Sequence, residues 1–503
     1  MQRVAANLQA VGGAVDPEAA AWIGLGPPPP GRPSISLGDE VGTLGPRSFG
    51  FLNNVDGVAP LAAPIPERPR RGGVALVVPR RDALPELVPL LLRRRMGLSW
   101  LISVGDGDPA DVLRFLAADP ATSGVLLALG RGSRAATLHG VLGSKQAALL
   151  ELPGIGTSRE GMLCRAVARR AGVPLVSELE AWLAHGSMYD VAARPARGRA
   201  AVVVLGAGAD LVAAEAQRAR LPPPHVLEPD DPALEAALAQ LSLNADVVLL
   251  CGDPEDTVRL TPPRPTLRVD PSRPEQLRAL MQAVAQRAPA PADSKPVQVR
   301  PDRERLHGLL TDLPPPLYAD GHMVLDEPLS DHDTKRLLRA YGVRVSRQAP
   351  ANTVTAAQRV AAQIGLPVVL VPAGDVEEVA CRTTGDLKRQ ATLLLQRAPH
   401  ILVREWFPES PRVRLVVVQE RGLGPVLRID EEAALVPLLR GEARELAEGL
   451  AATYDVDPRG LADMLAQISS VATEHTVTLD LQLHVSDAPA VVAASGTLRR
   501  PAP

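Results

Sequence analysis

The chain has 503 residues, 46% of them hydrophobic and 22% charged, a composition typical of folded globular proteins and not of chains disordered throughout. At roughly 150 residues per domain, this length predicts about three domains. Lysine and arginine number 54 against 57 acidic residues, so the net charge of −3 offers no basic surface for nucleic acid. Only 2% of residues are aromatic, which leaves few platforms for stacking bases. Nucleic acid is therefore not an expected partner.

Cysteine usage and hydrophobicity bear on the compartment. Cys164, Cys251 and Cys381 lie far apart and form no Cys-x-x-Cys pair, so neither a disulfide framework nor a zinc knuckle is expected. No stretch reaches about 18 uncharged apolar residues, and the N-terminus lacks the apolar core of a signal peptide. We expect a cytoplasmic protein with no membrane partner.

Taken in chain order, the sequence divides into five parts. Residues 1–71 are interrupted by prolines and predict a small incomplete unit with a linker. Residues 72–195 alternate short apolar runs with helical periodicity, which predicts a doubly wound α/β domain, and residues 196–287 repeat that pattern. Residues 288–324 open with a Pro-rich, charged stretch and are predicted to be a linker. Residues 325–503 no longer alternate apolar runs and helices in the same regular order, which predicts a mixed α+β domain.

Several short motifs are weak signals. GAGADL at 206–211 places glycines at a strand-to-helix turn, but the third glycine of a dinucleotide site is missing, so a structural turn is the better interpretation. LGRGSR at 129–134 has two arginines for an anion, yet a solvated loop is the safer interpretation. The nine histidines show no metal-binding spacing, and no G-x-S-x-G elbow is present.

Longer segments resemble the NDP-forming acyl-CoA synthetases, relatives of the succinyl-CoA synthetase alpha subunit. TLGPRSFGFLNN (43–54) is similar to the segment that closes the family's CoA-binding domain. SVGDGDPADVLRFLAADPAT (103–122) is similar to a run in the next domain. LSDHDTKRLLRAYGVRV (329–345) and the stretch 461–485 are similar to the opening and closing parts of the ATP-grasp domain. The likeness follows the family's domain order from about Val41 onward.

This resemblance implies a fold for each part. Residues 1–71 would hold a remnant of the CoA-binding domain, residues 72–195 and 196–287 two flavodoxin-like doubly wound domains, and residues 325–503 a reduced α+β ATP-grasp domain. It also implies site residues. Those at the CoA motif would be Gly45, Pro46, Ser48 and Gly50, and those at the nucleotide site Glu405, Asp480 and Gln482, with Asp480 a weak metal candidate.

The sequence departs from the family where phosphate is handled. Members carry phosphate on a histidine of a mobile loop, but residues 153–160, at the corresponding position, contain no histidine. Val371 stands where the resemblance places a nucleotide-binding lysine, and the family's glycine-rich loop is absent after Pro425. Pro79, Arg80 and Arg81 replace a Q-S-G turn.

Two hypotheses remain open. The first is a degenerate, non-catalytic homologue that acts as a binding or regulatory subunit, with no certain cofactor. The second is an active ADP-forming acid–CoA ligase that makes acyl-CoA from a carboxylic acid, CoA and ATP with Mg²⁺, its CoA domain supplied by a partner chain. A homo- or hetero-oligomer is expected in either case, because a missing half-domain leaves an apolar face to cover.

Overall fold

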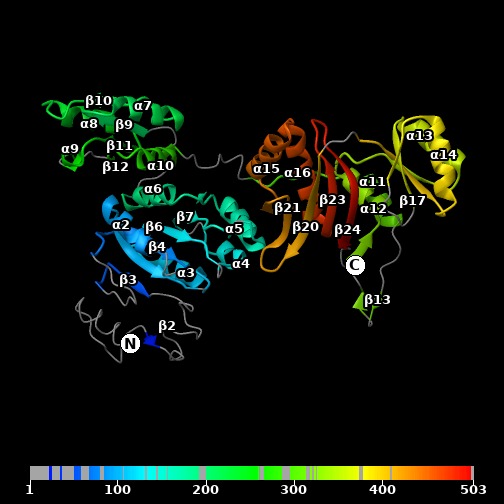
Figure 1. The fold of residues 1–503 in the computed structure, drawn as a ribbon. Coiled ribbons are helices and arrows are strands. Elements are labelled where there is room, and N and C mark those ends of the chain that lie inside the picture. Colours follow the sequence, from blue (N-terminus) through cyan, green and yellow to red (C-terminus); the bar gives the residue numbers. More distant parts are fainter. Residues whose placement is uncertain are drawn as a thin grey trace. The chain divides into compact units, whose positions relative to one another are not determined.

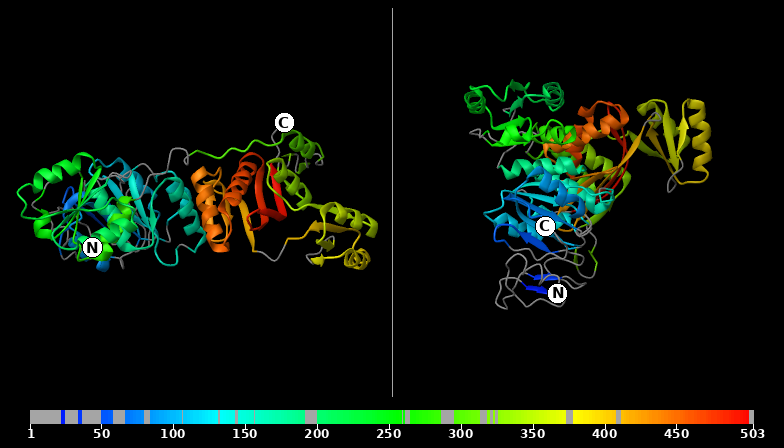
Figure 2. Two further views of the ribbon diagram at one scale, coloured as in Figure 1. Left: turned by 90° about the horizontal axis from the view of Figure 1, so that it is seen from above. Right: turned by 60° about the vertical axis from the view of Figure 1, so that its left-hand side comes forward.

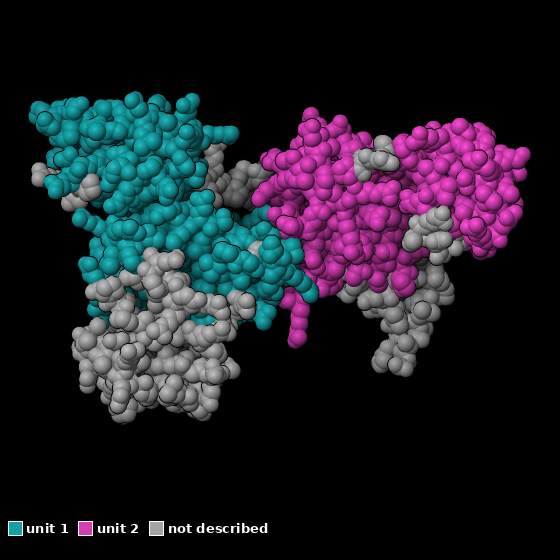
Figure 3. All heavy atoms as spheres, in the orientation of Figure 1, with its two compact units in different colours: residues 1–290 teal, residues 291–503 magenta. Residues whose placement is uncertain are grey.

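The computed structural model of the chain describes residues 22–24, 34–36, 50–57, 67–79, 84–105, 107–130, 133–142, 145–155, 157–191, 200–258, 260, 265–285, 295–312, 318–319, 322–323, 326–372, 378–407 and 411–499. The chain forms two compact units, Met1–Ala290 (unit 1) and Pro291–Pro503 (unit 2), which are coloured separately in Figure 3. Each unit is described by itself.

The first sheet of unit 1 has six strands in the order β3-β5-β4-β6-β7-β8. All neighbours are parallel except β3, which pairs antiparallel with β5. Numbered along the chain from β4, the parallel strands run 2-1-3-4-5. The central strands are continuous apolar runs, as expected where helices cover both faces of a parallel sheet. The strands are β3 (Phe51–Asn53), β4 (Arg71–Val78), β5 (Leu98–Ser103), β6 (Gly124–Ala128), β7 (Gln146–Leu150) and β8 (Leu175–Val176).

Four helices connect the strands from β4 to β8, and a fifth, α6, follows β8 (Figure 1). The Ser158 hydroxyl caps the fourth of them, accepting a hydrogen bond of 3.0 Å from the Gly161 amide. The helices are α2 (Leu84–Arg94), α3 (Ala110–Ala118), α4 (Ala135–His139), α5 (Arg159–Arg170) and α6 (Leu179–Asp190).

The second sheet of unit 1 has four parallel strands in the order β10-β9-β11-β12. Gly208 precedes its first helix with φ of +96°, a left-handed conformation that glycine adopts without strain, so the GAGADL segment forms a strand-to-helix turn. The elements are β9 (Ala200–Leu205), α7 (Ala209–Arg218), β10 (His225–Leu227), α8 (Leu234–Leu243), β11 (Val247–Cys251), α9 (Pro254–Val258), β12 (Thr266–Val269) and α10 (Pro274–Ala285).

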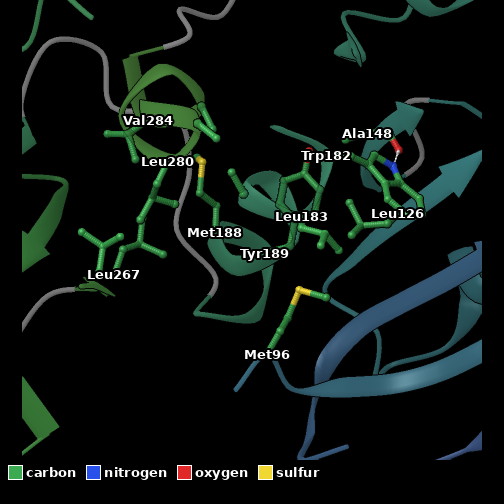
Figure 4. Packing of buried hydrophobic residues seen from close by; sticks show 14 of the residues in the cluster. Met96, Leu126, Ala148, Trp182, Leu183, Met188, Tyr189, Leu267, Leu280 and Val284 are labelled. Atoms are coloured by element: carbon green, nitrogen blue, oxygen red, sulfur yellow. Dashed lines mark hydrogen bonds between the residues drawn. The ribbon is translucent and has the colours of Figure 1, made fainter. Parts of the chain in front are cut away.

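Helix α6 joins the cores of the two sheets of unit 1. Its Leu183 and Met188 belong to one apolar cluster with Leu280 and Val284 of α10 (Figure 4). On the other side, Trp182 is fully buried and its indole N–H donates to the Ala148 carbonyl of β7 at 3.0 Å. The two sheets therefore share one continuous hydrophobic core.

Unit 2 is built on a six-stranded antiparallel sheet of order β15-β24-β23-β20-β21-β22. Leu479, Leu481 and Leu483 alternate along β23 and are buried in the core that also holds Leu465 and Ile468 of α16. Helices α15 and α16 pack against each other beside this sheet (Figures 1 and 2). The elements are α11 (Arg303–Asp312), β15 (Asp326–Leu329), α12 (Asp331–Ala340), β20 (Arg412–Glu420), β21 (Gly424–Ile429), β22 (Glu432–Leu435), α15 (Arg440–Tyr454), α16 (Pro458–Glu474), β23 (Thr476–His484) and β24 (Ala490–Arg499).

A smaller antiparallel sheet of order β16-β19-β17-β18 completes unit 2, with two helices that have a separate apolar core. Thr353 and Thr383 cap these helices, their hydroxyls accepting from the amides of Ala356 and Asp386 at 3.1 Å. The elements are β16 (Gln348–Ala351), α13 (Val354–Ile364), β17 (Val368–Pro372), β18 (Val379–Cys381), α14 (Thr384–Leu395) and β19 (Ile401–Glu405). Three-residue strands β1 (Trp22–Gly24) and β2 (Ser34–Ser36), and two-residue strands β13 (Tyr318–Ala319) and β14 (His322–Met323), form two further pairs.

The predicted α/β class is confirmed, and two elements differ from prediction. Helix α11 lies inside the predicted linker 288–324, because Leu309 is fully buried in the core of unit 2 and fixes this segment. Helix α4, directly after LGRGSR, was not predicted, because five residues carry too little periodicity. In the described part of the chain, no helix combines the length and apolarity needed to cross a membrane.

Candidate functional site

The structure places the predicted site residues on separate elements. Glu405 is the last residue of β19 in the small sheet, whereas Asp480 and Gln482 lie on β23 of the large sheet. No hydrogen bond or ion pair between Glu405 and either of the other two is found among the described residues. Gly50 precedes β3 with φ of +98°, and its carbonyl accepts from the Ser103 amide at 3.0 Å. The other predicted CoA-motif residues lie outside the described residues: Gly45, Pro46 and Ser48.

Asp480 is paired with an arginine on the neighbouring strand. Buried and outward-facing residues alternate along β20 and β23, which puts Arg414, Asp480 and Gln482 on the sheet face opposite the core. Arg414 donates to both carboxylate oxygens of Asp480, Nε to Oδ1 at 2.9 Å and Nη2 to Oδ2 at 2.5 Å. These hydrogen bonds, together with the carboxylate charge, raise the pKa of Arg414. Exposed Gln482 lies opposite Arg414 in the strand register.

Glu405 is likewise held by the chain itself. Its Oε2 accepts from the Arg347 backbone amide at 3.1 Å, and its Oε1 lies 3.3 Å from Arg347 Nη2. Burial raises the pKa of Glu405, but the hydrogen bonds and positive charge of Arg347 outweigh burial and lower it overall. Both predicted carboxylates are therefore already partnered by arginines of the chain.

A third carboxylate, Glu378, links the two sheets of unit 2. It accepts a hydrogen bond from Arg404 of β19 and lies 3.3 Å from Nη2 of Arg412 of β20. The Arg404 side chain is 8% exposed. Burial raises the pKa of Glu378, yet the two arginines outweigh it and the pKa is lowered. Glu378 thus neutralises arginines from both sheets.

Lys335 of α12 is buried beside this junction, with 1% of its surface exposed. Its ammonium donates to Gln348 Oε1 at 2.6 Å and to the Val492 carbonyl at 2.7 Å, and lies 3.0 Å from Asp331 Oδ2. Burial lowers the pKa of Lys335 to about 8, despite the charge of Asp331. All three ammonium hydrogens have acceptors within the protein, so Lys335 is committed to the fold.

Val371, at the position of the expected lysine, lies on β17 opposite Leu402 of β19. Its side chain is half-buried and carries no charge. The strand that would present a phosphate-binding ammonium therefore presents only apolar surface at this point.

In unit 1, a cavity of about 270 Å³ is lined in part by residues 153–160, the segment where the resemblance places a phosphohistidine loop. It lies beyond the carboxyl ends of β6 and β7, and none of the described residues that line it is a histidine. Glu160 Oε1 accepts from the Ala135 amide at 2.6 Å, so the chain's own carboxylate caps α4. Burial raises the pKa of Cys164 to about 12, which keeps this thiol protonated at neutral pH. The lining residues are Gly130, Ser133, Gly154, Ile155, Ser158, Glu160, Gly161 and Cys164.

Pro79 follows β4 and packs against Gly130, which comes after β6, at the point where the strand order reverses. In open α/β sheets this switch point is the usual place for ligands. A Cβ atom added to Gly130, which follows β6, would lie only 2.3 Å from Pro79 Cβ. The proline ring thus packs directly on the glycine backbone beyond the ends of the two strands.

The described residues include no group of three or more histidine, cysteine or acidic side chains arranged to hold a metal. The sequence indicated Glu405 and Asp480 as candidates but not their arginine partners. The alternation of arginines with apolar residues in RVRLVVV was an available signal that Arg412 and Arg414 share a face. Their partners depend on strand register, which the sequence does not specify.

No protein-family model matches this sequence, and no curated protein matches it. Solved structures are similar to parts of the chain. One is apo acetyl-coenzyme A synthetase 1 of Ca. Korarchaeum cryptofilum, described as dinucleotide forming, at 19% identity and a TM-score of 0.31, covering 34% of this chain and 93% of that one. PH1788 from Pyrococcus horikoshii OT3 is similar at 18% identity and a TM-score of 0.32, and the match covers 40% of this chain and 98% of that one. PH0766 from the same organism is similar at 17% identity and a TM-score of 0.38, and the match covers 48% of this chain and 70% of that one.

Proposed function

We propose that this chain is a non-catalytic homologue of the NDP-forming acyl-CoA synthetases that acts as a binding or regulatory subunit. In this proposal the two parallel sheets of unit 1 are flavodoxin-like domains, and unit 2 is a reduced ATP-grasp domain. The sequence resemblance supports this, and so does the 2-1-3-4-5 strand order, which is the flavodoxin-like order.

The ion pair between Arg414 and Asp480 is the observation that carries the proposal. Mg²⁺ at a nucleotide site is held by carboxylates together with phosphate oxygens. Here both oxygens of Asp480 are within 2.9 Å of guanidinium nitrogens. A divalent cation at this carboxylate would have to displace Arg414, at a small cost because the pair is exposed, or share the site with a like charge, which is unfavourable.

Two further features support loss of phosphate chemistry. Val371 offers no charge to a triphosphate, and Lys335 is buried with three acceptors of its own. The cavity beyond β6 and β7 has no histidine to accept a phosphoryl group. Independent changes at three places argue against a single misaligned motif.

Phosphoryl transfer is the direct test. The full chain is incubated with γ-labelled ATP and Mg²⁺, with and without acetate and CoA, beside an active ADP-forming acyl-CoA synthetase as positive control. We expect no label on the protein and no ADP above the background without enzyme. Retained label, or ADP formation that depends on acid and CoA, would overturn the proposal in favour of a working ligase.

A second measurement addresses the binding role. Thermal unfolding is followed with increasing ATP, ADP or CoA, since a ligand that binds only the folded state raises the melting temperature with its free concentration. Light scattering after size-exclusion chromatography tests the proposed oligomer. A monomer that neither ligand nor partner stabilises would contradict the subunit role.

A further inference from the structure

We propose that a groove in unit 1, formed by α2, α6 and the start of α10, binds a small phosphate-bearing metabolite. The groove has a volume of about 530 Å³, within the range of pockets that hold small molecules. It is separate from the cavity beyond β6 and β7 and involves none of the residues discussed for catalysis. Its lining residues are Leu90, Arg93, Arg94, Glu180, Arg273, Pro274, Glu275 and Gln276.

Arg94 forms the fixed part of the groove. Its side chain is 4% exposed and forms an ion pair with Glu180 of α6. Burial lowers the pKa of Arg94, the pair with Glu180 opposes this, and the positive charge of Arg273 lowers it further. The guanidinium groups of Arg94 on α2 and of Arg273, just before α10, are therefore close enough to repel each other. Glu180 is paired with Arg94.

The other two arginines are exposed and weakly committed. Arg273 contacts Asp270 through Nε at 3.7 Å, a distance beyond a hydrogen bond. Within the described part of the chain, no hydrogen bond or ion pair is found for the Arg93 side chain. Glu275, the second carboxylate of the lining, also acts on Arg278, whose pKa its charge helps to raise. The groove is thus lined by three guanidinium groups and two carboxylates, and one of these carboxylates, Glu180, is already paired with Arg94.

Guanidinium groups recognise phosphate through paired hydrogen bonds, and uncommitted arginines in a concave site are suited to this. The arginines of unit 2 contrast with them, since Arg347, Arg404 and Arg414 each have a carboxylate at hydrogen-bond distance. The apolar surfaces of Leu90 and Pro274 add contact area for an organic group. A compact metabolite with one or two phosphate groups fits this combination of charge and volume.

The test uses the full chain, without Mg²⁺ and at low ionic strength, with inorganic pyrophosphate and ADP as probes in titration calorimetry. The double variant Arg93→Ala/Arg273→Ala removes the charge of Arg93 and the loosely paired charge of Arg273, and leaves the pair of Arg94 with Glu180 intact. Arg114→Ala is the matched control, because Arg114 is an exposed surface arginine paired with Asp111 on α3. Melting curves establish that each variant is folded.

We expect saturable binding of at least one probe to the wild-type chain and to Arg114→Ala, weakened at least tenfold in the double variant. Absence of binding by both probes would overturn the proposal, and so would equal binding by wild type and double variant. Equal weakening by Arg114→Ala would also overturn it, since that outcome indicates nonspecific attraction to positive charge. The measurement involves no phosphoryl transfer, so its result is independent of whether the chain is catalytic.

Discussion

His185 and Tyr189 lie one turn apart on α6, with ring centroids 6.2 Å apart in the core of unit 1. The Tyr189 hydroxyl donates to the Ala147 carbonyl at 2.9 Å. Both residues are buried, and burial lowers the pKa of His185 to about 4. A neutral imidazole is therefore part of the packed interior.

Stability should fall as the pH drops from about 6.5 to about 4. The unfolded chain takes up a proton at its ordinary histidine pKa of about 6.5, whereas the folded chain resists protonation down to about 4. At 1.36 kcal/mol for each pKa unit, His185 alone accounts for a loss of about 3 kcal/mol across this window and for none above it.

Urea unfolding at several pH values checks this expectation. Carboxylates also titrate near pH 4, so the comparison is with His185→Gln, which should show a smaller loss between pH 6.5 and 5. An identical pH dependence in the variant would contradict the assignment to His185.

Lys335→Met should destabilise the chain by about 1–3 kcal/mol, because it leaves the Val492 carbonyl and Gln348 Oε1 without their donor. The Asp331 carboxylate loses its ammonium partner but is partly exposed and keeps the Ala494 amide as a donor at 2.8 Å. Lys388→Met, at an exposed position of α14, should change the unfolding free energy by less than about 0.5 kcal/mol. Denaturant midpoints provide both values, and equal midpoints for the two variants would refute a structural role for Lys335.

Gly130→Ala should cost about 1–3 kcal/mol through overpacking. Gly130 is not among the described residues with positive φ, so the cost comes from the contact with Pro79 at 2.3 Å and not from backbone strain. In a chain that already carries Pro79→Gly, the Gly130→Ala substitution should cost less than it does in the wild-type chain. If the two substitutions have strictly additive effects in the double-mutant cycle, the contact between Pro79 and Gly130 does not cause the loss.

Two arginines of unit 2 should differ in their effect on stability. The pair of Arg414 with Asp480 has side chains 70% and 40% exposed, so Arg414→Ala should leave the unfolding free energy almost unchanged. Arg404→Ala removes an 8% exposed guanidinium and leaves Glu378 with Arg412 alone, at a cost of about 3 kcal/mol. Calorimetric melting of both variants measures the difference, and a reversed order would refute the burial argument.

Local sequence pattern predicted most elements of the fold but few of the contacts. The apolar runs of β4, β6 and β11 and the periodicity of α5 and α13 are visible without a structure, because burial on both faces or on one stripe leaves a direct mark. Helix α11 was hidden by the prolines that precede it. The partners of Asp480 and Glu405 come from neighbouring strands and a preceding loop, so only tertiary register brings them together.

Helix α6 has one apolar stripe on β7 and another on α10, and this limits how unit 1 can be divided. A fragment that ends after α6 would expose Leu183 and Met188 to water, and one that begins at β9 would expose Leu280 and Val284. Chain cleavage between the two sheets should therefore yield halves that remain associated under native conditions and separate only in denaturant. The two sheets are two domains by topology, but we expect them to purify together and to unfold together.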